Sequence, residues 1–150
     1  THAFENNGAK FDEFGSLKNW WTEADLEAFD KKAEDMITLF DGLETGFGKC
    51  NGKLTVSENI ADSGGIRCAF EASSKTNTHN PDEFFKNWAR VWRMKASEQF
   101  SQLLLNVDVH GPAILRANVQ LSNLPEFQEL YKIDEEDKMY LAKDKMVSIW

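Results

Sequence analysis

Two pairs of ionisable side chains have the types and spacing of a metal site. Glu5 follows His2 by three positions, and Asp62 follows Glu58 by four. Positions four apart on a helix share one face, so Glu58 and Asp62 can point into the same site. One carboxylate could then bind a metal while the other orients a ligand. The residue types alone equally fit a surface histidine and a solvated helix face.

A third group of polar residues surrounds a rigid turn. Asp108 and His110 come before Gly111-Pro112, and Arg116 follows. Such a turn presents a histidine and an arginine together, as a site that stabilises negative charge requires. Loop polarity produces the same pattern more often than catalysis does, so composition leaves the function open.

The elements that position these groups are predicted to be helices. Thr22 can cap a helix with Asp25 as its reciprocal partner. Apolar residues then recur at helical spacing: Leu26, Phe29, Ala33, Met36, Ile37 and Phe40. The glycines that follow predict a turn-rich loop. We expect a second helix to begin near Ser57 and to carry Glu58 and Asp62.

Asn80-Pro81 followed by two acidic residues is a strong helix start. One broad apolar face is predicted after it: Phe84, Phe85, Trp88, Val91, Trp92, Ala96, Phe100, Leu103 and Leu104. Gly111-Pro112 and Pro125 predict two shorter helices beyond Asn106. No stretch alternates with the period of a strand. We expect a mainly α domain with these side chains in its core: Trp20, Phe29, Phe40, Phe84, Trp88 and Trp92.

Length and charge exclude several classes of protein. A chain of 150 residues predicts one domain with a real core. Its net charge of −8 argues against partners such as nucleic acid or an anionic membrane surface, and no apolar run is long enough to span a bilayer. Cys50 and Cys68 are too few for a disulfide framework, which favours a reduced compartment. Because the first residue is Thr1, we expect the true N-terminus to lie upstream.

Four blocks of sequence resemble one known family. Thr1-His2-Ala3-Phe4 is similar to the end of an H-E-x-T-H-A/G-F zinc motif, and residues 56–65 read V-S-E-N-I-A-D-S-G-G. The other blocks are K-N-W-W-T at residues 18–22 and D-V-H-G-P at 108–112, with Arg116, Asn118 and a closing Trp beyond. In this order the set resembles the neprilysin and endothelin-converting enzyme family, including its bacterial oligoendopeptidase members, over essentially the whole chain.

This resemblance implies a fold and a zinc site. The chain would be the C-terminal helical part of a thermolysin-like zinc-peptidase catalytic domain, with residues 1–150 as a single unit that begins inside the zinc-binding helix. His2 and Glu58 match zinc ligands, and Asp62 matches a carboxylate that hydrogen-bonds a ligand imidazole. Glu5 stands where the family has an Asp that orients the second histidine.

The resemblance also implies residues that contact substrate. His110 matches the residue that stabilises the oxyanion of the tetrahedral intermediate, with Asp108 holding it in place. Arg116 matches the residue that hydrogen-bonds a backbone carbonyl of the peptide. The first His and the general-base Glu of the motif are not among these residues. We therefore expect a zinc metalloendopeptidase acting on oligopeptides as the parent protein, and an inactive 150-residue fragment that needs the upstream lobe.

Other interpretations remain open at this point. Positions where animal members carry cysteines correspond to Arg93, Lys132 and Val147, which favours a bacterial and cytoplasmic protein. Glu5 leaves room for a non-catalytic peptide-binding or scaffold domain that keeps the family fold. An aminopeptidase of the thermolysin-like group could share the ligand layout, but the D-x-H block with Arg116 argues against it.

Overall fold

The computed structural model describes residues 2–149 as a mainly helical fold. Thr1 and Trp150, which belong to the zinc-motif block and to the closing position, lie outside the described residues. Within 2–149 the only β-type pairing consists of two isolated bridges, so the expected mainly α class is confirmed. No helix in this part of the chain is long and apolar enough to cross a membrane.

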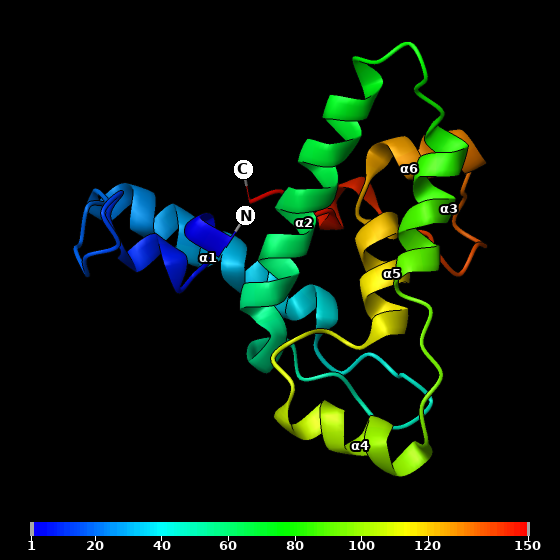
Figure 1. The fold of residues 1–150 in the computed structure, drawn as a ribbon, viewed down its shortest axis with the longest axis horizontal. Coiled ribbons are helices and arrows are strands. Elements are labelled where there is room, and N and C mark those ends of the chain that lie inside the picture. The colour runs from blue at the N-terminus through cyan, green and yellow to red at the C-terminus, as the bar shows by residue number, and fades with distance from the viewer. Residues whose placement is uncertain (1, 150) are drawn as a thin grey trace.

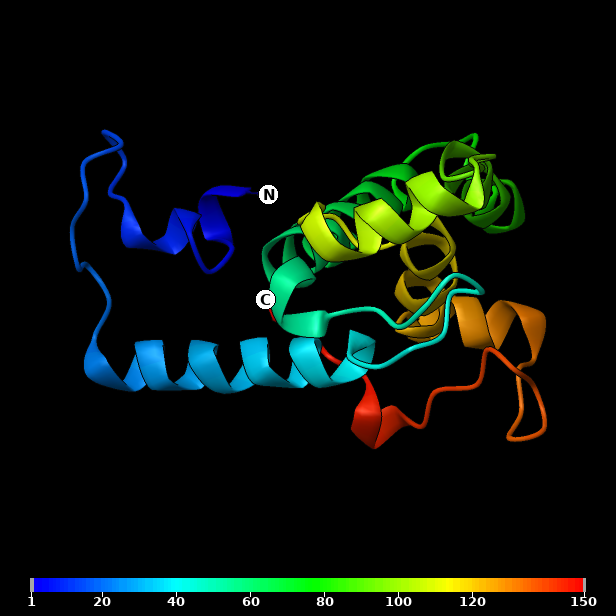
Figure 2. The ribbon, with the colours of Figure 1, turned by 90° about the horizontal axis from the view of Figure 1, so that it is seen from below.

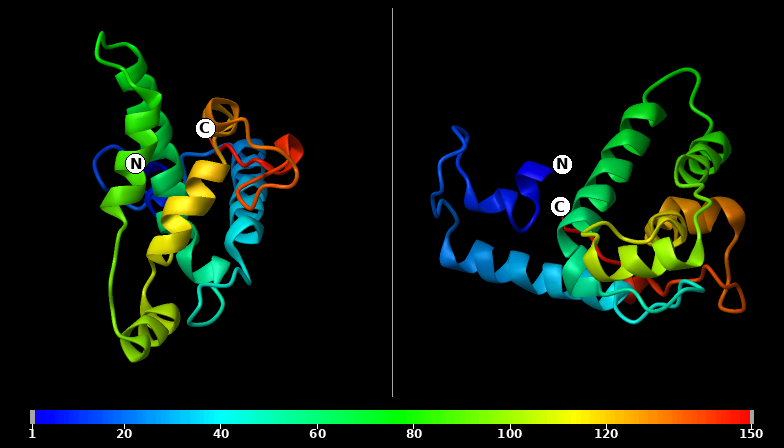
Figure 3. Two further views of the ribbon diagram at one scale, coloured as in Figure 1. Left: turned by 90° about the vertical axis from the view of Figure 1, so that its right-hand side faces the viewer. Right: turned by 60° about the horizontal axis from the view of Figure 1, so that its bottom comes forward.

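Six α-helices and three short 3-10 helices make up the described part (Figure 1). In chain order they are η1 (His2–Phe4), η2 (Gly8–Lys10), α1 (Glu23–Phe40), α2 (Gly52–Ser74), α3 (Pro81–Val91), α4 (Glu98–Val107), α5 (Ala113–Ser122), α6 (Pro125–Tyr131) and η3 (Lys143–Lys145). The views of Figure 3 show α2 rising from the C-terminal end of α1, with α5 beside it. The two shorter helices expected after Asn106 are α5 and α6.

Side-chain caps fix where several helices begin. The Thr22 hydroxyl accepts a hydrogen bond from the Asp25 backbone N–H at 3.1 Å and donates one to the Asp25 carboxylate at 2.6 Å. The Asn80 side chain accepts from the Glu83 N–H at 3.1 Å, and Pro81 follows as the first helical residue. Both predicted starts are therefore confirmed, because each cap uses only local chemistry.

The expected start of α2 near Ser57 is wrong, because the helix begins at Gly52. Asn51 caps it by accepting from the Leu54 N–H at 2.9 Å. Gly52 is buried against the end of α1, where a Cβ would collide with the backbone carbonyl of Ile37. This glycine therefore permits close helix packing, whereas the sequence pattern assigned it to a loop.

The broad apolar face expected from Phe84 to Leu104 is divided between two helices. Helix α3 ends at Val91, and a new helix begins after Ser97, whose hydroxyl accepts from the Phe100 N–H at 3.3 Å. The break turns α4 away from the core, so Phe100 and Leu103 are exposed. Figure 1 shows α4 apart from the other helices.

Two clusters of buried side chains form the core. The first joins α1, α2, α5 and the C-terminal residues: Phe29, Ala33, Met36, Phe40, Cys50, Val56, Ile60, Leu115, Val147 and Ile149. The second joins α2, α3, α5 and α6: Ile66, Phe85, Leu121, Leu124 and Phe127, with Phe84 and Trp88 packed against it. The expected core positions Phe29, Phe40, Phe84 and Trp88 are confirmed, and Trp92 is half-buried.

The expected burial of Trp20 is wrong, since 47% of this residue is exposed. Its indole N–H donates to the Phe11 carbonyl at 3.0 Å, and the indole N–H of Trp21 donates to the Ala9 carbonyl at 2.7 Å. The pair thus ties the N-terminal segment to α1, with Trp21 packed on Phe29 at 5.3 Å between ring centroids. Figure 2 shows this segment folding back over α1 toward the start of α2.

Candidate active site

Glu58 and Asp62 lie one turn apart on α2, with side chains only 16% and 13% exposed. Glu58 contacts His110, and Asp62 contacts Arg116, so both carboxylates face the segment that joins α4 to α5 and the first turn of α5. The sequence prediction that these residues share one face is confirmed. Glu58, Asp62, His110 and Arg116 form one cluster.

Two imidazoles approach the same oxygen of Glu58. His2 Nε2 lies 3.5 Å from Glu58 Oε2, and His110 Nε2 lies 3.3 Å from it. At these distances the attraction is that of an ion pair when the rings are protonated. The structure therefore brings together three of the predicted site residues, from η1, α2 and the turn before α5.

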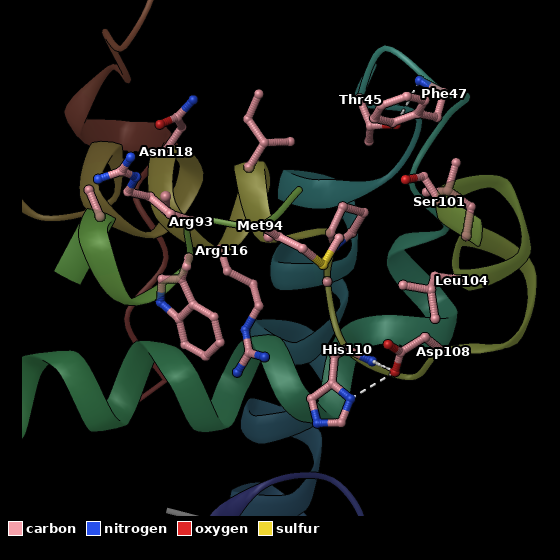
Figure 4. A pocket seen from close by; sticks show the side chains of 18 residues that line it. Thr45, Phe47, Arg93, Met94, Ser101, Leu104, Asp108, His110, Arg116 and Asn118 are labelled. Atoms are coloured by element: carbon pink, nitrogen blue, oxygen red, sulfur yellow. Dashed lines mark hydrogen bonds and ion pairs between the residues drawn. The ribbon is translucent and has the colours of Figure 1, made fainter. Parts of the chain in front are cut away.

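Asp108 holds the other side of the His110 ring. Its Oδ1 lies 2.8 Å from His110 Nδ1 and accepts the His110 backbone N–H at 3.0 Å (Figure 4). Partial burial opposes ionisation of Asp108, but these hydrogen bonds outweigh it and keep the pKa of the carboxyl below its usual value. The ionised carboxylate accepts from Nδ1–H, so Nε2 is the nitrogen turned toward Glu58.

Arg116 is fixed by a carboxylate and an aromatic ring. Its Nε and Nη2 donate to the two oxygens of Asp62 at 2.7 and 2.8 Å, and the guanidinium carbon lies 3.6 Å from the centroid of a Trp92 ring. The fork of a guanidinium matches a carboxylate in this way, and its flat face stacks on an aromatic ring. In Figure 4 the Arg116 and His110 side chains both extend toward α2.

Glu5 builds the turn that follows His2. Its two carboxylate oxygens accept the backbone N–H groups of Asn7 and Gly8, each at 2.8 Å, and the residue is buried. The carboxylate oxygens of Glu5 are therefore paired with backbone N–H groups rather than with the His2 imidazole. The orientation of His2 by Glu5, and the contact of Asp62 with a ligand imidazole, stay predictions.

Sequence reasoning missed the role of Asn59. This residue is fully buried, its Nδ2 donates to the Thr55 hydroxyl at 3.0 Å, and its backbone carbonyl accepts from Gln120 at 3.0 Å. A Cβ on Gly111 would lie 2.8 Å from Asn59 Oδ1, so the glycine lets the His110 turn pack directly on α2. The position of Asn59 in the sequence, between Glu58 and Asp62, was the signal that could have indicated this role.

A cavity of about 640 Å³ opens beside His110 and Arg116. Its other walls are mainly apolar and come from the loop before α2, from α4 and the segments on either side of it, and from the first turn of α5: Phe47, Trp92, Met94, Leu104, Pro112 and Ile114. Figure 4 shows the labelled side chains of these elements around the space. The arrangement places two hydrogen-bond donors at the edge of an apolar hollow.

The donor set at Glu58 fits zinc in type. Zinc takes imidazole nitrogen and carboxylate oxygen as ligands, and His2 and Glu58 supply one of each. Between residues 2 and 149 there is no group of three His, Cys, Asp or Glu side chains arranged to hold a metal. These residues would therefore supply two ligands of such a site.

Comparison with known sequences identifies a family. The model of peptidase family M13 matches residues 1–147. Along its whole length the chain is 53% identical to the neutral endopeptidase of Lactococcus lactis subsp. lactis, of which it covers 24%. It is 32% identical over 146 residues to Neprilysin-3 of Drosophila melanogaster, covering 88% of this chain and 19% of that protein.

Solved structures share the fold. The crystal structure of PepO from Lactobacillus rhamnosis HN001 matches 99% of the chain with a TM-score of 0.90 and 40% identity, and 24% of that chain is covered. The inhibitor complex of the Mycobacterium tuberculosis zinc metalloprotease ZMP1 matches 99% with a TM-score of 0.94 and 28% identity, with 25% of that chain covered. The 150 residues thus span about a quarter of the length of the bacterial relatives.

Proposed function

Because this chain belongs to peptidase family M13, we propose that the protein it forms part of is a zinc metalloendopeptidase that hydrolyses oligopeptides. The observation that carries the proposal is the approach of His2 and His110 to one oxygen of Glu58, at 3.5 and 3.3 Å. A ligand-type carboxylate lies there between two imidazoles, with Arg116 close by. The names of the relatives as a neutral endopeptidase and a zinc metalloprotease support it.

In this proposal His2 and Glu58 would hold zinc, which when bound would polarise the scissile carbonyl as a Lewis acid. A catalytic zinc site has three protein ligands. The third ligand and the general base therefore come from outside the 150 residues, as does the lobe that binds the rest of the peptide. Residues 1–150 are in this view a single C-terminal part of the catalytic domain.

His110 would stabilise the negative charge that develops on the carbonyl oxygen. When protonated, it donates Nδ1–H to Asp108, and its Nε2–H, which faces Glu58 in this structure, would be available to the oxyanion once Glu58 binds zinc. The fixed ring needs no reorganisation during the reaction, and one such donor contributes about 3–4 kcal/mol in comparable enzymes. Asp108 serves this role by staying ionised at neutral pH.

Arg116 would position the peptide. The Nε and Nη2 groups of Arg116 donate to Asp62, which leaves Nη1 to donate to a backbone carbonyl of the substrate. The stack on Trp92 and the two hydrogen bonds restrict the side chain, so little entropy is lost when the peptide binds. This pre-organisation is what a residue that aligns a scissile bond requires.

We also place the protein in the bacterial cytoplasm as part of this proposal. Both cysteines are free, with Cys50 buried and Cys68 exposed, which suits a reducing compartment. The bacterial relatives are consistent with the assignment. Fractionation of the source cell with an antibody against the protein would test it, and recovery outside the cell would contradict it.

The activity is tested with the full-length protein and an oligopeptide that is acetylated at its N-terminus. We expect cleavage at an internal bond, loss of cleavage with a chelator, and recovery when zinc is returned. An aminopeptidase would leave the blocked peptide intact, and a scaffold domain would bind it without cleavage. Either result would overturn the proposal.

A further inference from the structure

We propose that the Ser57 hydroxyl positions the zinc site by holding the turn that carries His2 against α2. This inference rests on the proposed roles of His2 and Glu58 as zinc ligands. It concerns a residue that lies next to Glu58 in sequence and whose hydroxyl hydrogen-bonds to Asn6 and Asn7.

Ser57 makes two hydrogen bonds to the loop after η1. Its Oγ accepts from Asn7 Nδ2 at 2.8 Å and donates to Asn6 Oδ1 at 2.8 Å. A hydroxyl has one proton to donate and lone pairs to accept with, so both partners are satisfied at once. We call these two hydrogen bonds the clasp. Because the two asparagines lie 50 and 51 residues away from Ser57 in sequence, the clasp joins separate elements.

The clasped loop is rigidly connected to His2. The Glu5 carboxylate accepts the N–H groups of Asn7 and Gly8, each at 2.8 Å, which closes a tight turn. Gly8 packs so closely on this turn that a Cβ there would collide with the His2 carbonyl oxygen. A displacement of Asn7 therefore displaces the backbone of His2 as well.

The other side of the clasp is fixed by the core. Val56 and Ile60 on α2 are buried in the first core cluster, which holds Ser57 and Glu58 in place. The His2–Phe4 helix is exposed in all three residues, so little apolar burial holds it. The polar clasp is thus well placed to set the separation between His2 and Glu58, which is 3.5 Å between Nε2 and Oε2.

The test compares three variants of the full-length protein with the parent. Ser57→Ala removes the clasp, and Ser57→Thr keeps a hydroxyl. Ser74→Ala is the matched control, because Ser74 lies at the far end of the same helix and donates to the Glu71 carbonyl at 2.8 Å. The readouts are the zinc Kd, measured by competition with a chelator, and amide hydrogen exchange of residues 6–8.

We expect Ser57→Ala to weaken zinc binding by about tenfold, the lower end of what supporting residues of metal sites contribute, and to speed exchange of residues 6–8. Ser57→Thr should restore most of the affinity, and Ser74→Ala should match the parent in both readouts. A zinc Kd for Ser57→Ala within twofold of the parent, or an equal loss in Ser74→Ala, would overturn the inference. Absence of zinc from the parent itself would instead refute the proposed function and the inference together.

Discussion

At the scale of single residues, the side chains of His110 and Arg116 are each held by a carboxylate. Arg116 combines two hydrogen bonds to Asp62 with a stack on Trp92. Arg116→Lys keeps the positive charge but loses the planar fork and the stack. We expect kcat/KM to fall by about 10- to 100-fold, the worth of a charge-assisted hydrogen bond, with zinc content unchanged. Steady-state kinetics on the full-length variant within twofold of the parent would argue against a positioning role.

A substitution at His110 can distinguish an effect on catalysis from an effect on metal binding. Asp108 holds its ring through Nδ1 at 2.8 Å, so the side chain is fixed without help from zinc. For His110→Phe we expect zinc to be retained, while kcat falls by about 10²- to 10³-fold, as for removal of an oxyanion donor. Metal analysis and single-turnover rates on the same sample check this. Loss of zinc in the variant would mean that His110 is a ligand.

Some of these residues could be predicted from their neighbours in sequence. Glu58 and Asp62 are one helical turn apart, and Asp108 and His110 are two residues apart, so local geometry brings each pair together. The pairing of Asp62 with Arg116 spans 54 residues. Such contacts depend on how whole helices pack, which residue types and spacing do not specify.

At the scale of elements, the same distinction between local contacts and helix packing separates the helix starts that were predicted correctly from the one that was not. Asn80-Pro81 caps a helix through chemistry within four residues, so the start of α3 was predictable. The start of α2 was not, because Gly52 is present for the approach of α1. A glycine that permits packing and a glycine that permits a turn look alike in a sequence.

Two glycines of α2 give opposite predictions. At Gly52 an added Cβ would meet the Ile37 carbonyl and lie 2.9 Å from the Asp41 backbone N, so Gly52→Ala should lower the stability of the full-length protein by about 1–3 kcal/mol. At Gly65 the added Cβ meets nothing within 4 Å, and Gly65→Ala should be neutral or stabilising by about 0.5–1 kcal/mol through helix propensity. Chemical denaturation measures both. Equal effects would show that Gly52 is not a packing contact.

At the scale of the whole molecule, the proposed function needs one more zinc ligand and a general base in addition to the residues described here. His2 and Glu58 give two candidate ligands, and within residues 2–149 no group of three His, Cys, Asp or Glu side chains is arranged to hold a metal. We expect the isolated 150-residue chain to bind zinc weakly and to hydrolyse no peptide, because a catalytic zinc site has three protein ligands and these residues offer two, without the general base. Calorimetric titration with zinc and a peptide-cleavage assay check this. Chelator-sensitive cleavage by the purified chain would contradict it.

The central claim is that Glu58 is a zinc ligand, and the zinc content of the full-length Glu58→Gln variant tests it most directly. The amide keeps the shape of the side chain but removes its charge, which zinc binding uses. Glu71→Gln is the matched control, since Glu71 is an exposed glutamate on the same helix. We expect Glu58→Gln to lose both zinc and peptide cleavage while Glu71→Gln keeps them. A Glu58→Gln protein that retains one zinc per chain and cleaves peptide at the parent rate would contradict the assignment.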